Sequence, residues 1–267
     1  PHGVVVGGGN NQATGSYSFI GGGGDAGTAA NRNTASGDWS VVVGGGKNIA
    51  SGQGSFIGTN SNPTSNPNTA SGAGALIIGG TNQTASNTNT FIGGGYSNLA
   101  NGYCSGIVAG IGATNRSIWG TLNHATNVFS TTGDAQIGTF VLMKATTDAT
   151  PSVMTCGNLA ASTTNQVILP NNSAYYVRGS IVAGVTGGGN TSSWTFQGTI
   201  KRGANAASTA LVGAMTATLV TQDAGASTWA VSLTADTTNG GLAVTVTGQA
   251  ATTIRWVCKI ETTEMTY

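Results

Sequence analysis

A short pattern recurs through the first 112 residues, and it constrains the fold of this chain more than any other feature. Each copy carries an alanine, a small polar segment, two or three apolar residues and a run of glycine, as in ASGDWSVVVGGG. The alanines lie 22, 15, 20, 15 and 15 residues apart, at Ala13, Ala35, Ala50, Ala70, Ala85 and Ala100. The base period is therefore 15, with insertions of seven and five residues before Ala35 and Ala70. A period this short cannot hold a helical hairpin, so it predicts one coil of a parallel β-solenoid per repeat.

The residue types within each repeat suit a solenoid coil. Apolar triplets such as residues 41–43 predict short strands, and the glycine-rich and asparagine-rich segments predict corners, because both residues tolerate positive φ. Successive side chains of a strand point to opposite faces, so each triplet places apolar groups on both faces. One face can fill the narrow interior of the coil, and the other needs a partner. We therefore expect a homo-oligomer.

Composition excludes several classes of protein. Charged residues make up 6% of the 267 positions, against about 25% in ordinary globular domains, and the net charge is +1. Nucleic-acid binding therefore has no basic stripe to rest on. No apolar run approaches the roughly 20 residues that cross a bilayer. The abundance of glycine and β-branched residues argues against long helices. The composition thus predicts an all-β protein with no nucleic-acid partner and no membrane insertion.

The second half of the chain has a different pattern. The repeat is lost after about Gly112, and residues 113–133 are predicted to form a connector or further degenerate coils. From Asp134 onward, apolar and polar residues alternate as they do in antiparallel strands. Strands are predicted at residues 138–145, 165–170, 174–185, 193–202, 210–221, 227–235, 241–248 and 254–260. This pattern predicts a β-sandwich or a jelly roll over residues 134–267, after a repeat domain over residues 1–112.

Both halves resemble known families. The pattern A-[ST]-G-x-x-S, followed by apolar residues and GGG, resembles the head repeats of trimeric autotransporter adhesins and related repeats in fibres of tailed bacteriophages. This resemblance covers roughly residues 3–112 and implies a left-handed parallel β-roll in which three chains interlock. In the second half, a C-terminal domain of phage fibre and structural proteins is similar to residues 133–155, 197–213, 231–248 and 253–264. Together the resemblances imply a homotrimeric fibre, of tail or head, on the surface of a phage virion.

Such a fibre is expected to attach the virion to a host-surface glycan or protein without catalysis, and three chains would add avidity. One alternative is a purely structural virion fibre whose terminal domain registers the trimer. Others are a glycan depolymerase with a site between subunits, and a bacterial adhesin, although the sequence ends at Tyr267 without the membrane anchor of such adhesins. The sequence begins at Pro1 in mid-repeat, so we expect a preceding part to join it to other virion proteins.

Titratable residues are too few to predict an enzyme. The acids are Asp25, Asp38, Asp134, Asp148, Asp223, Asp236, Glu261 and Glu264. Cleavage of a glycan needs two carboxylates about 5–10 Å apart in a groove. Asp25 and Asp38 are the pair that stacked coils from three chains would bring together. Both are otherwise expected in turns, and Glu261 and Glu264 are expected to be solvated.

Other motifs with a chemical meaning are incomplete. Residues 102–106 (GYCSG) imitate a nucleophile elbow with Cys104 in the serine position, but no helix or histidine partner accompanies it. Residues 44–47 (GGGK) lack the rest of a phosphate-binding loop. His2 and His124 are isolated and expected to be exposed. The three cysteines, Cys104, Cys156 and Cys258, are predicted to be small buried residues. We therefore expect no catalytic residue, cofactor or metal.

A sugar-binding site needs fewer specialised residues than an active site, because sugars are recognised by aromatic faces, amides and hydroxyls. The aromatic candidates are Tyr17, Trp39 and Tyr103 in the repeats, and Tyr175, Tyr176, Trp194 and Trp229 in the second half. Each can equally belong to a core, since Trp194 alternates with Phe196 and Trp229 with Val231. Residues 186–193 are predicted to form an exposed loop tip. The sequence does not single out the residues that bind a receptor.

Overall fold

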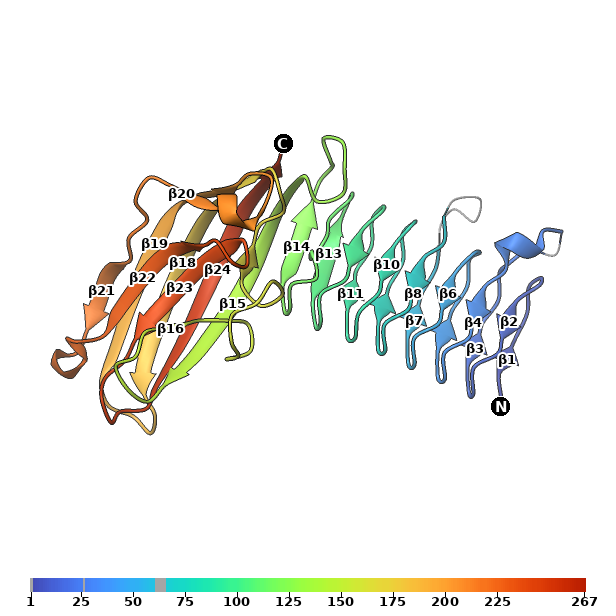
Figure 1. Ribbon diagram of the computed structural model, residues 1–267. Helices are drawn as coiled ribbons and strands as arrows, with labels where there is room; N and C mark the ends of the chain where they lie inside the picture. The colour runs from blue at the N-terminus through green and yellow to red at the C-terminus, as the bar shows by residue number, and fades with distance from the viewer. Residues whose placement is uncertain (1, 26, 61–65) are drawn as a thin grey trace. The chain divides into compact units, whose positions relative to one another are not determined.

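The computed structural model describes residues 2–25, 27–60 and 66–267 and confirms that the chain is nearly all β (Figure 1). Pro1 and most of the predicted second insertion, residues 61–65, lie outside the described residues. The chain divides into two compact units, residues 1–136 and residues 137–267. We call them the solenoid unit and the sandwich unit, and each is described by itself.

The solenoid unit contains two parallel sheets, and each complete coil gives one short strand to each, while the strands at the two ends of the first sheet have no counterpart in the second. The first sheet holds, in spatial order, β1 (Val4–Val5), β3 (Phe19–Ile20), β5 (Val41–Val42), β7 (Phe56–Ile57), β9 (Leu76–Ile77), β11 (Phe91–Ile92), β13 (Gly106–Gly110) and β14 (Leu122–Ala125). The second sheet holds β2 (Gln12–Ala13), β4 (Thr34–Ala35), β6 (Ile49–Ala50), β8 (Thr69–Ala70), β10 (Thr84–Ala85) and β12 (Leu99–Ala100). The parallel solenoid predicted from the repeat is therefore confirmed.

The strand register follows the alanine alignment. Ala35 pairs with Ala50 across 15 residues, and Ala50 pairs with Ala70 across 20. The pairing of the alanines therefore keeps its register across both insertions. The one before Ala35 includes the 3-10 turn η1 (Ala29–Asn31). Beyond the last regular repeat, β14 still pairs in parallel with β13, with one irregularity, so residues 113–133 include a further coil.

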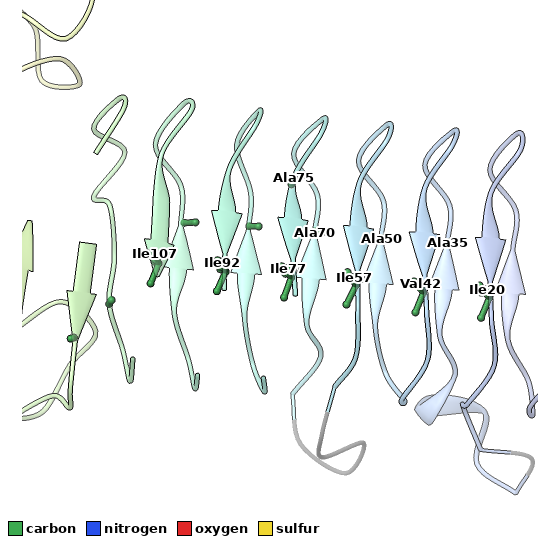
Figure 2. Close-up of a cluster of buried hydrophobic side chains, with 14 residues drawn as sticks. Ile20, Ala35, Val42, Ala50, Ile57, Ala70, Ala75, Ile77, Ile92 and Ile107 are labelled. Carbon is green, nitrogen blue, oxygen red and sulfur yellow. The ribbon is translucent and has the colours of Figure 1, made fainter. Parts of the chain in front are cut away.

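Each coil encloses a narrow apolar interior (Figure 2). The first sheet contributes a large aliphatic side chain and the second contributes alanine, because a coil this thin has no room for two large groups. The buried column comprises Ile20, Val42, Ile57, Ile77, Ile92 and Ile107 opposite Ala35, Ala50, Ala70, Ala85 and Ala100, all of them fully buried.

A ladder of amide side chains runs beside this column. It uses the residue two positions before each alanine, at Asn11, Asn33, Asn48, Asn68, Gln83 and Asn98. In each of the pairs Asn33–Asn48 and Gln83–Asn98, the side-chain oxygen of the first residue accepts the backbone N–H of the second, one coil later. The Asn98 amide nitrogen donates to the carbonyls of Gly94 and Gly110, at 3.0 and 2.8 Å. The sequence pattern had placed asparagine only at corners, whereas these buried amides satisfy backbone groups inside the coil.

Removing one rung of this ladder is expected to cost stability. Asn98→Ala would leave the Ala113 N–H, which Asn98 Oδ1 accepts at 2.8 Å, and the Gly94 carbonyl without their side-chain partner. The Gly110 carbonyl would lose one of its two donors and keep the Tyr96 N–H. Each buried polar group left unpaired costs about 1–3 kcal/mol, so we expect a loss of about 2–4 kcal/mol in chemical denaturation. Thr84→Ala, outside the coil, should change stability by less than about 0.5 kcal/mol. Equal effects from the two variants would contradict a structural role for the ladder.

The sandwich unit contains two antiparallel sheets. The larger has the order β15 (Ala135–Thr146), β24 (Ile254–Thr266), β18 (Ser173–Val185), β19 (Thr191–Arg202), with β20 (Ala210–Val212) and β21 (Thr218–Gln222) both on β19. In the smaller, β23 (Gly241–Thr247) pairs with β22 (Ala230–Asp236), β16 (Ser152–Val153) and β17 (Val167–Ile168). Two short 3-10 turns, η2 (Ala206–Ser208) and η3 (Ala224–Ala226), lie in the connections. The single strand predicted at residues 210–221 is wrong, because a loop at 213–217 separates β20 from β21.

Aromatic side chains fill the core of the sandwich unit. The fully buried Trp256 of β24 lies with its ring centroid 5.5 Å from that of Trp194 and 5.8 Å from that of Trp229, which directly precedes β22. The indole N–H of Trp256 donates to Thr146 Oγ1 at 3.0 Å. Trp256 therefore joins the inner faces of the two sheets.

Candidate functional site

The outer face of the larger sandwich sheet gathers several of the few charged side chains in the protein. Strand alternation points Tyr176 and Arg178 outward from β18, and Lys259 and Glu261 outward from β24. The antiparallel register places Arg178 directly opposite Glu261 on one side and opposite Gln197 of β19 on the other. These groups meet because β18 pairs with β24 along its whole length, from Ser173 with Thr266 to Val185 with Ile254.

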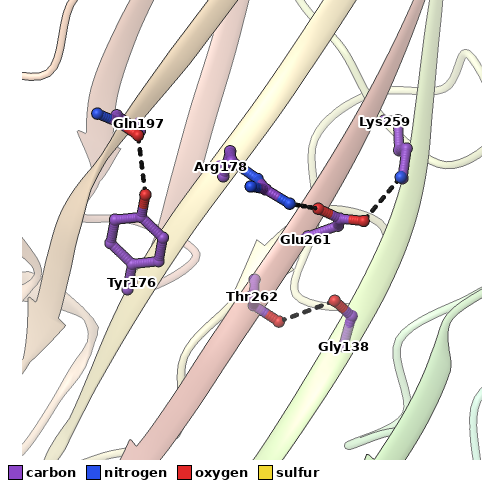
Figure 3. A network of polar contacts seen from close by, with 7 residues as sticks. All are labelled: Gly138, Tyr176, Arg178, Gln197, Lys259, Glu261 and Thr262. Atoms are coloured by element: carbon purple, nitrogen blue, oxygen red, sulfur yellow. Dashed lines mark hydrogen bonds and ion pairs between the residues drawn. The ribbon is translucent and has the colours of Figure 1, made fainter.

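Glu261 is held between two cations (Figure 3). Its Oε1 lies 2.7 Å from Lys259 Nζ, and its Oε2 accepts a hydrogen bond from the Arg178 guanidinium at 2.6 Å. Beside this cluster the Tyr176 hydroxyl donates to Gln197 Oε1 at 2.9 Å. Hydrogen bonding from Lys259, and then from Arg178, lowers the pKa of the Glu261 carboxyl from 4.5 to about 2. These hydrogen bonds and ion pairs hold the polar side chains of Tyr176, Gln197, Arg178, Glu261 and Lys259 in place on the outer face of the sheet.

This assignment gives a pH prediction. Because the folded-state pKa of Glu261 is depressed, its contribution to stability is complete above pH 4.5 and is lost as the pH falls towards about 2. Carbon NMR titration of the carboxyl should show the low pKa in the wild type. Lys259→Met should raise this pKa, and Arg178→Met should raise it less, because Lys259 is the larger cause. An unchanged Glu261 pKa in Lys259→Met would show that the pair does not persist in solution.

A cleft of about 600 Å³ opens beside the ion cluster. Its lining carries hydroxyls, an amide and three charged groups, from Arg178, Ser180, Thr195, Gln197, Thr216, Thr218, Lys259 and Glu261. The loop between β20 and β21 forms one wall and is anchored by the buried Met215, whose side chain fills the space over Gly198. A second cleft of about 420 Å³ shares Arg178 and Glu261 with the first.

The lining of the larger cleft offers groups that can bind a polar ligand. Hydroxyls, an amide and a fixed ion pair can exchange hydrogen bonds with a polar ligand such as a sugar. Glu261 is the one carboxylate in its lining, and both of its oxygens are engaged by cations. The two-carboxylate arrangement of a glycosidase is therefore not present among the residues that line this cleft.

Exposed aromatic residues mark one edge of the solenoid unit, at the tight turns that lead from the second sheet to the first. The Tyr17 and Trp39 rings of adjacent coils stack with centroids 6.4 Å apart and planes 6° apart. His2 lies 5.6 Å from Tyr17 on the other side. Tyr103 meets Trp119 edge-on at 5.8 Å. Tyr17 and Trp39 thus keep their accessibility as binding candidates, as does Tyr176 on the sandwich unit.

Tyr103 is likewise exposed, whereas the remaining three aromatic candidates belong to the core. Tyr175, Trp194 and Trp229 are buried, so their role is packing. The two acids considered for catalysis lie in turns at opposite ends of the coil, Asp25 after β3 and Asp38 after β4. Asp38 accepts the Ser16 amide, while the Gly27 amide and the Asn31 side chain bind Asp25 and lower its pKa. One chain alone therefore does not bring them together.

Several smaller expectations need correction. Cys104 is exposed and Cys156 is half-buried, so only Cys258 of the three cysteines is buried as predicted. Desolvation raises the pKa of Cys156 to about 11 and that of Cys258 to about 12. His124 is half-buried, with Nδ1 3.0 Å from the Ala109 carbonyl. Glu264 is buried instead of solvated, and its Oε1 accepts the Thr262 hydroxyl at 2.6 Å.

Within residues 2–25, 27–60 and 66–267, no group of three or more His, Cys, Asp or Glu side chains is placed to hold a metal ion. In the same residues, no helix has the length and apolar character needed to span a membrane.

Comparison with known proteins gives distant structural similarity only. No protein-family model matches the sequence, and no curated protein matches it. One similar solved structure is a tailspike and capsular polysaccharide depolymerase of Acinetobacter baumannii bacteriophage Fri1, with 11% identity, a TM-score of 0.30, and 92% of this chain and 39% of that chain covered. Others are the tailspikes of Acinetobacter phage vB_ApiP_P1 (11% identity, TM-score 0.21, 97% and 54% covered) and of Acinetobacter baumannii phage AM24 (10% identity, TM-score 0.23, 95% and 50% covered). The chain thus spans between 39% and 54% of the length of these proteins.

Proposed function

We propose that three copies of this chain form a fibre on the surface of a tailed-phage virion and attach it to a host-surface glycan or protein without catalysis. The observation that carries the proposal is a column of apolar side chains on the outer face of the first solenoid sheet. We call this column the apolar stripe, and it comprises Val4, Val6, Phe19, Val41, Val43, Phe56, Leu76, Ile78, Phe91 and Val108, all exposed or half-exposed in the single chain.

The two outer faces of the coils differ in a way that supports assembly. The outward residues of the second sheet are mostly polar, at Gln12, Thr34, Ile49, Thr69, Thr84 and Leu99. A continuous apolar face running along the coils is seldom left in contact with water, and it marks a contact with another protein surface. Because the stripe runs along a parallel repeat, a parallel association of identical chains would cover it coil by coil. Three chains is the number that the resemblance to trimeric adhesin and phage-fibre repeats implies.

Attachment is supported by the polar surfaces of the molecule. The cleft beside Arg178 and Glu261 offers hydroxyls and an amide, and a ligand bound weakly by each of three chains is held strongly by all of them. A single carboxylate in that lining, and the separation of Asp25 from Asp38 within the coil, favour binding over hydrolysis.

Assembly is tested by light scattering during gel filtration. The wild type should give about 79 kDa, three times the chain mass of 26.3 kDa. Phe91→Asp, which places a charge in the apolar stripe, should give 26.3 kDa, while Thr84→Asp on the outer face of the second sheet should remain trimeric. A monomeric wild type would refute the assembly.

Attachment is tested separately with fluorescently labelled chain and a panel of bacterial strains. We expect the trimer to adsorb to some strains and to block infection of those strains by the phage that carries it. A trimer that adsorbs to none of them would instead match the purely structural fibre. Release of reducing ends from host polysaccharide would contradict the non-catalytic proposal.

A further inference from the structure

The tight turns of the solenoid hold one residue of each coil in the left-handed region of backbone space. These residues are Tyr17, Trp39, Gly54, Gly74, Asn89 and Cys104, with φ between 51° and 64°. Glycine adopts this conformation without strain and asparagine with little, whereas a tyrosine or tryptophan is strained there. Two adjacent coils therefore carry a bulky aromatic residue at a position whose backbone favours glycine.

Burial does not compensate this strain. Tyr17 is 60% exposed and Trp39 is 54% exposed, although the two rings stack on each other. Backbone strain that burial does not offset motivates a hypothesis of function at the strained position. The strain here keeps two flat rings stacked on the outer edge of the coils.

The next place in this aromatic column is open. The Gly54 N–H donates to the Asp38 carbonyl, so the Gly54 coil lies on the opposite side of Trp39 from Tyr17. A β-carbon at Gly54 would meet no atom within 4 Å, whereas one at Gly74 would lie 2.6 Å from Asn89 Oδ1. The edge thus has open space over Gly54, next to the Trp39 indole, and we call this place the turn-edge slot.

We propose that the turn-edge slot binds a pyranose ring of an uncharged surface glycan, stacked on Trp39. The apolar face of a sugar ring fits an exposed indole, and the open space over Gly54 leaves room for the ring beside it. The inference rests on the proposed attachment function and names a ligand and a site for it, apart from the cleft of the sandwich unit.

Charge favours a neutral glycan over a nucleic acid or an acidic polymer. The turn residues 14–18, 36–40, 51–55, 71–75, 86–90 and 101–105 contain one charged side chain, Asp38, and no lysine or arginine. Stacking of nucleic-acid bases on aromatic rings is accompanied by cations that track the phosphates, and these turns supply none. Binding should therefore persist at high salt.

The full-length trimer with Trp39→Gly tests the proposal, because the substitution removes the indole and relieves the strain together. The matched control is Cys104→Gly, which changes the equivalent position four coils along without removing an aromatic ring. The probes are lipopolysaccharide and capsular polysaccharide extracted from cells to which the wild type adsorbs. We expect Trp39→Gly to keep the trimer mass and an equal or higher melting temperature, yet to weaken polysaccharide binding about tenfold or more. Cys104→Gly should bind like the wild type, and Gly54→Trp, which fills the slot, should bind weakly.

The outcomes separate this inference from the attachment function. If the wild type and Trp39→Gly adsorb and bind polysaccharide equally, the slot is not the site and the attachment function stands. If Trp39→Gly lowers the melting temperature or dissociates the trimer, Trp39 is a packing residue and the proposal is overturned. If the wild type binds no strain and no extracted polysaccharide, both proposals fail.

Discussion

Gly95→Ala is expected to destabilise the solenoid unit by about 3–5 kcal/mol, a large effect for a single methyl group. Gly95 has a φ of +104°, which an alanine adopts only with strain. Its β-carbon would also lie 2.0 Å from the Gly110 carbonyl oxygen, one coil along. That carbonyl accepts the Asn98 amide, so any shift that relieves the clash disturbs the buried ladder as well. Backbone strain, steric overlap and a weakened hydrogen bond all act at one position.

The adjacent glycine supplies the control. A β-carbon at Gly94 would meet nothing within 4 Å, and its φ lies outside the left-handed range, so Gly94→Ala should change stability by less than about 0.5 kcal/mol. Urea denaturation followed by circular dichroism measures both variants. Similar stabilities for Gly94→Ala and Gly95→Ala would show that the coils are not packed as closely as the structure has them.

The solenoid could be predicted from sequence because the spacing of the repeated alanines gives the register of its strands. Alanine is the residue that fits opposite isoleucine in so thin a coil, so its recurrence marks one position per coil. The insertions did not hide the period, since Ala13 still pairs with Ala35 and Ala50 with Ala70. The amide ladder was missed because asparagine has two uses here. It takes positive φ at corners, as Asn89 does, and it satisfies buried backbone groups, as Asn98 does.

The sandwich core could be predicted in part for a similar reason. Alternation along residues 254–260 identifies Trp256 and Cys258 as buried, and the structure confirms both. The strand continues to Thr266, and its same face buries Thr262 and Glu264. The alternation of apolar and polar residues did not reveal this extension, because a polar residue at an inward position usually indicates that a strand has ended. The hydrogen bond between Thr262 and Glu264 is what makes the burial tolerable.

The candidate site was largely beyond the reach of sequence. Arg178 and Glu261 are 83 residues apart, and only the pairing of β18 with β24 makes them neighbours. The scarcity of charged residues was the one sequence feature that pointed to this site. An arginine in the middle of a strand, in a chain with so few charges, predicts an acidic partner on a neighbouring strand. The turn-edge slot depends on the open space over Gly54. The sequence shows that this position is a glycine, but not whether neighbouring atoms occupy the space that a larger side chain would fill.

Trp256→Ala is expected to cost the sandwich unit about 3–5 kcal/mol. The side chain is fully buried and lies within ring contact of Trp194 and Trp229, so its removal leaves a cavity between the two sheets. It also leaves Thr146 Oγ1 without the indole N–H. Near-ultraviolet circular dichroism should lose the signal of the coupled indoles at the same time, because that signal depends on their fixed geometry.

Two further variants divide this loss into its causes. Thr146→Val removes the acceptor of the indole N–H and keeps the packing, so it should cost about 1 kcal/mol. Val257→Ala changes the next residue, which points to the outer face, and should cost less than about 1 kcal/mol. If Thr146→Val were as harmful as Trp256→Ala, the hydrogen bond would dominate over the packing. If Val257→Ala were as harmful, the inward and outward faces of β24 would have been exchanged, and with them the cleft built on Lys259 and Glu261.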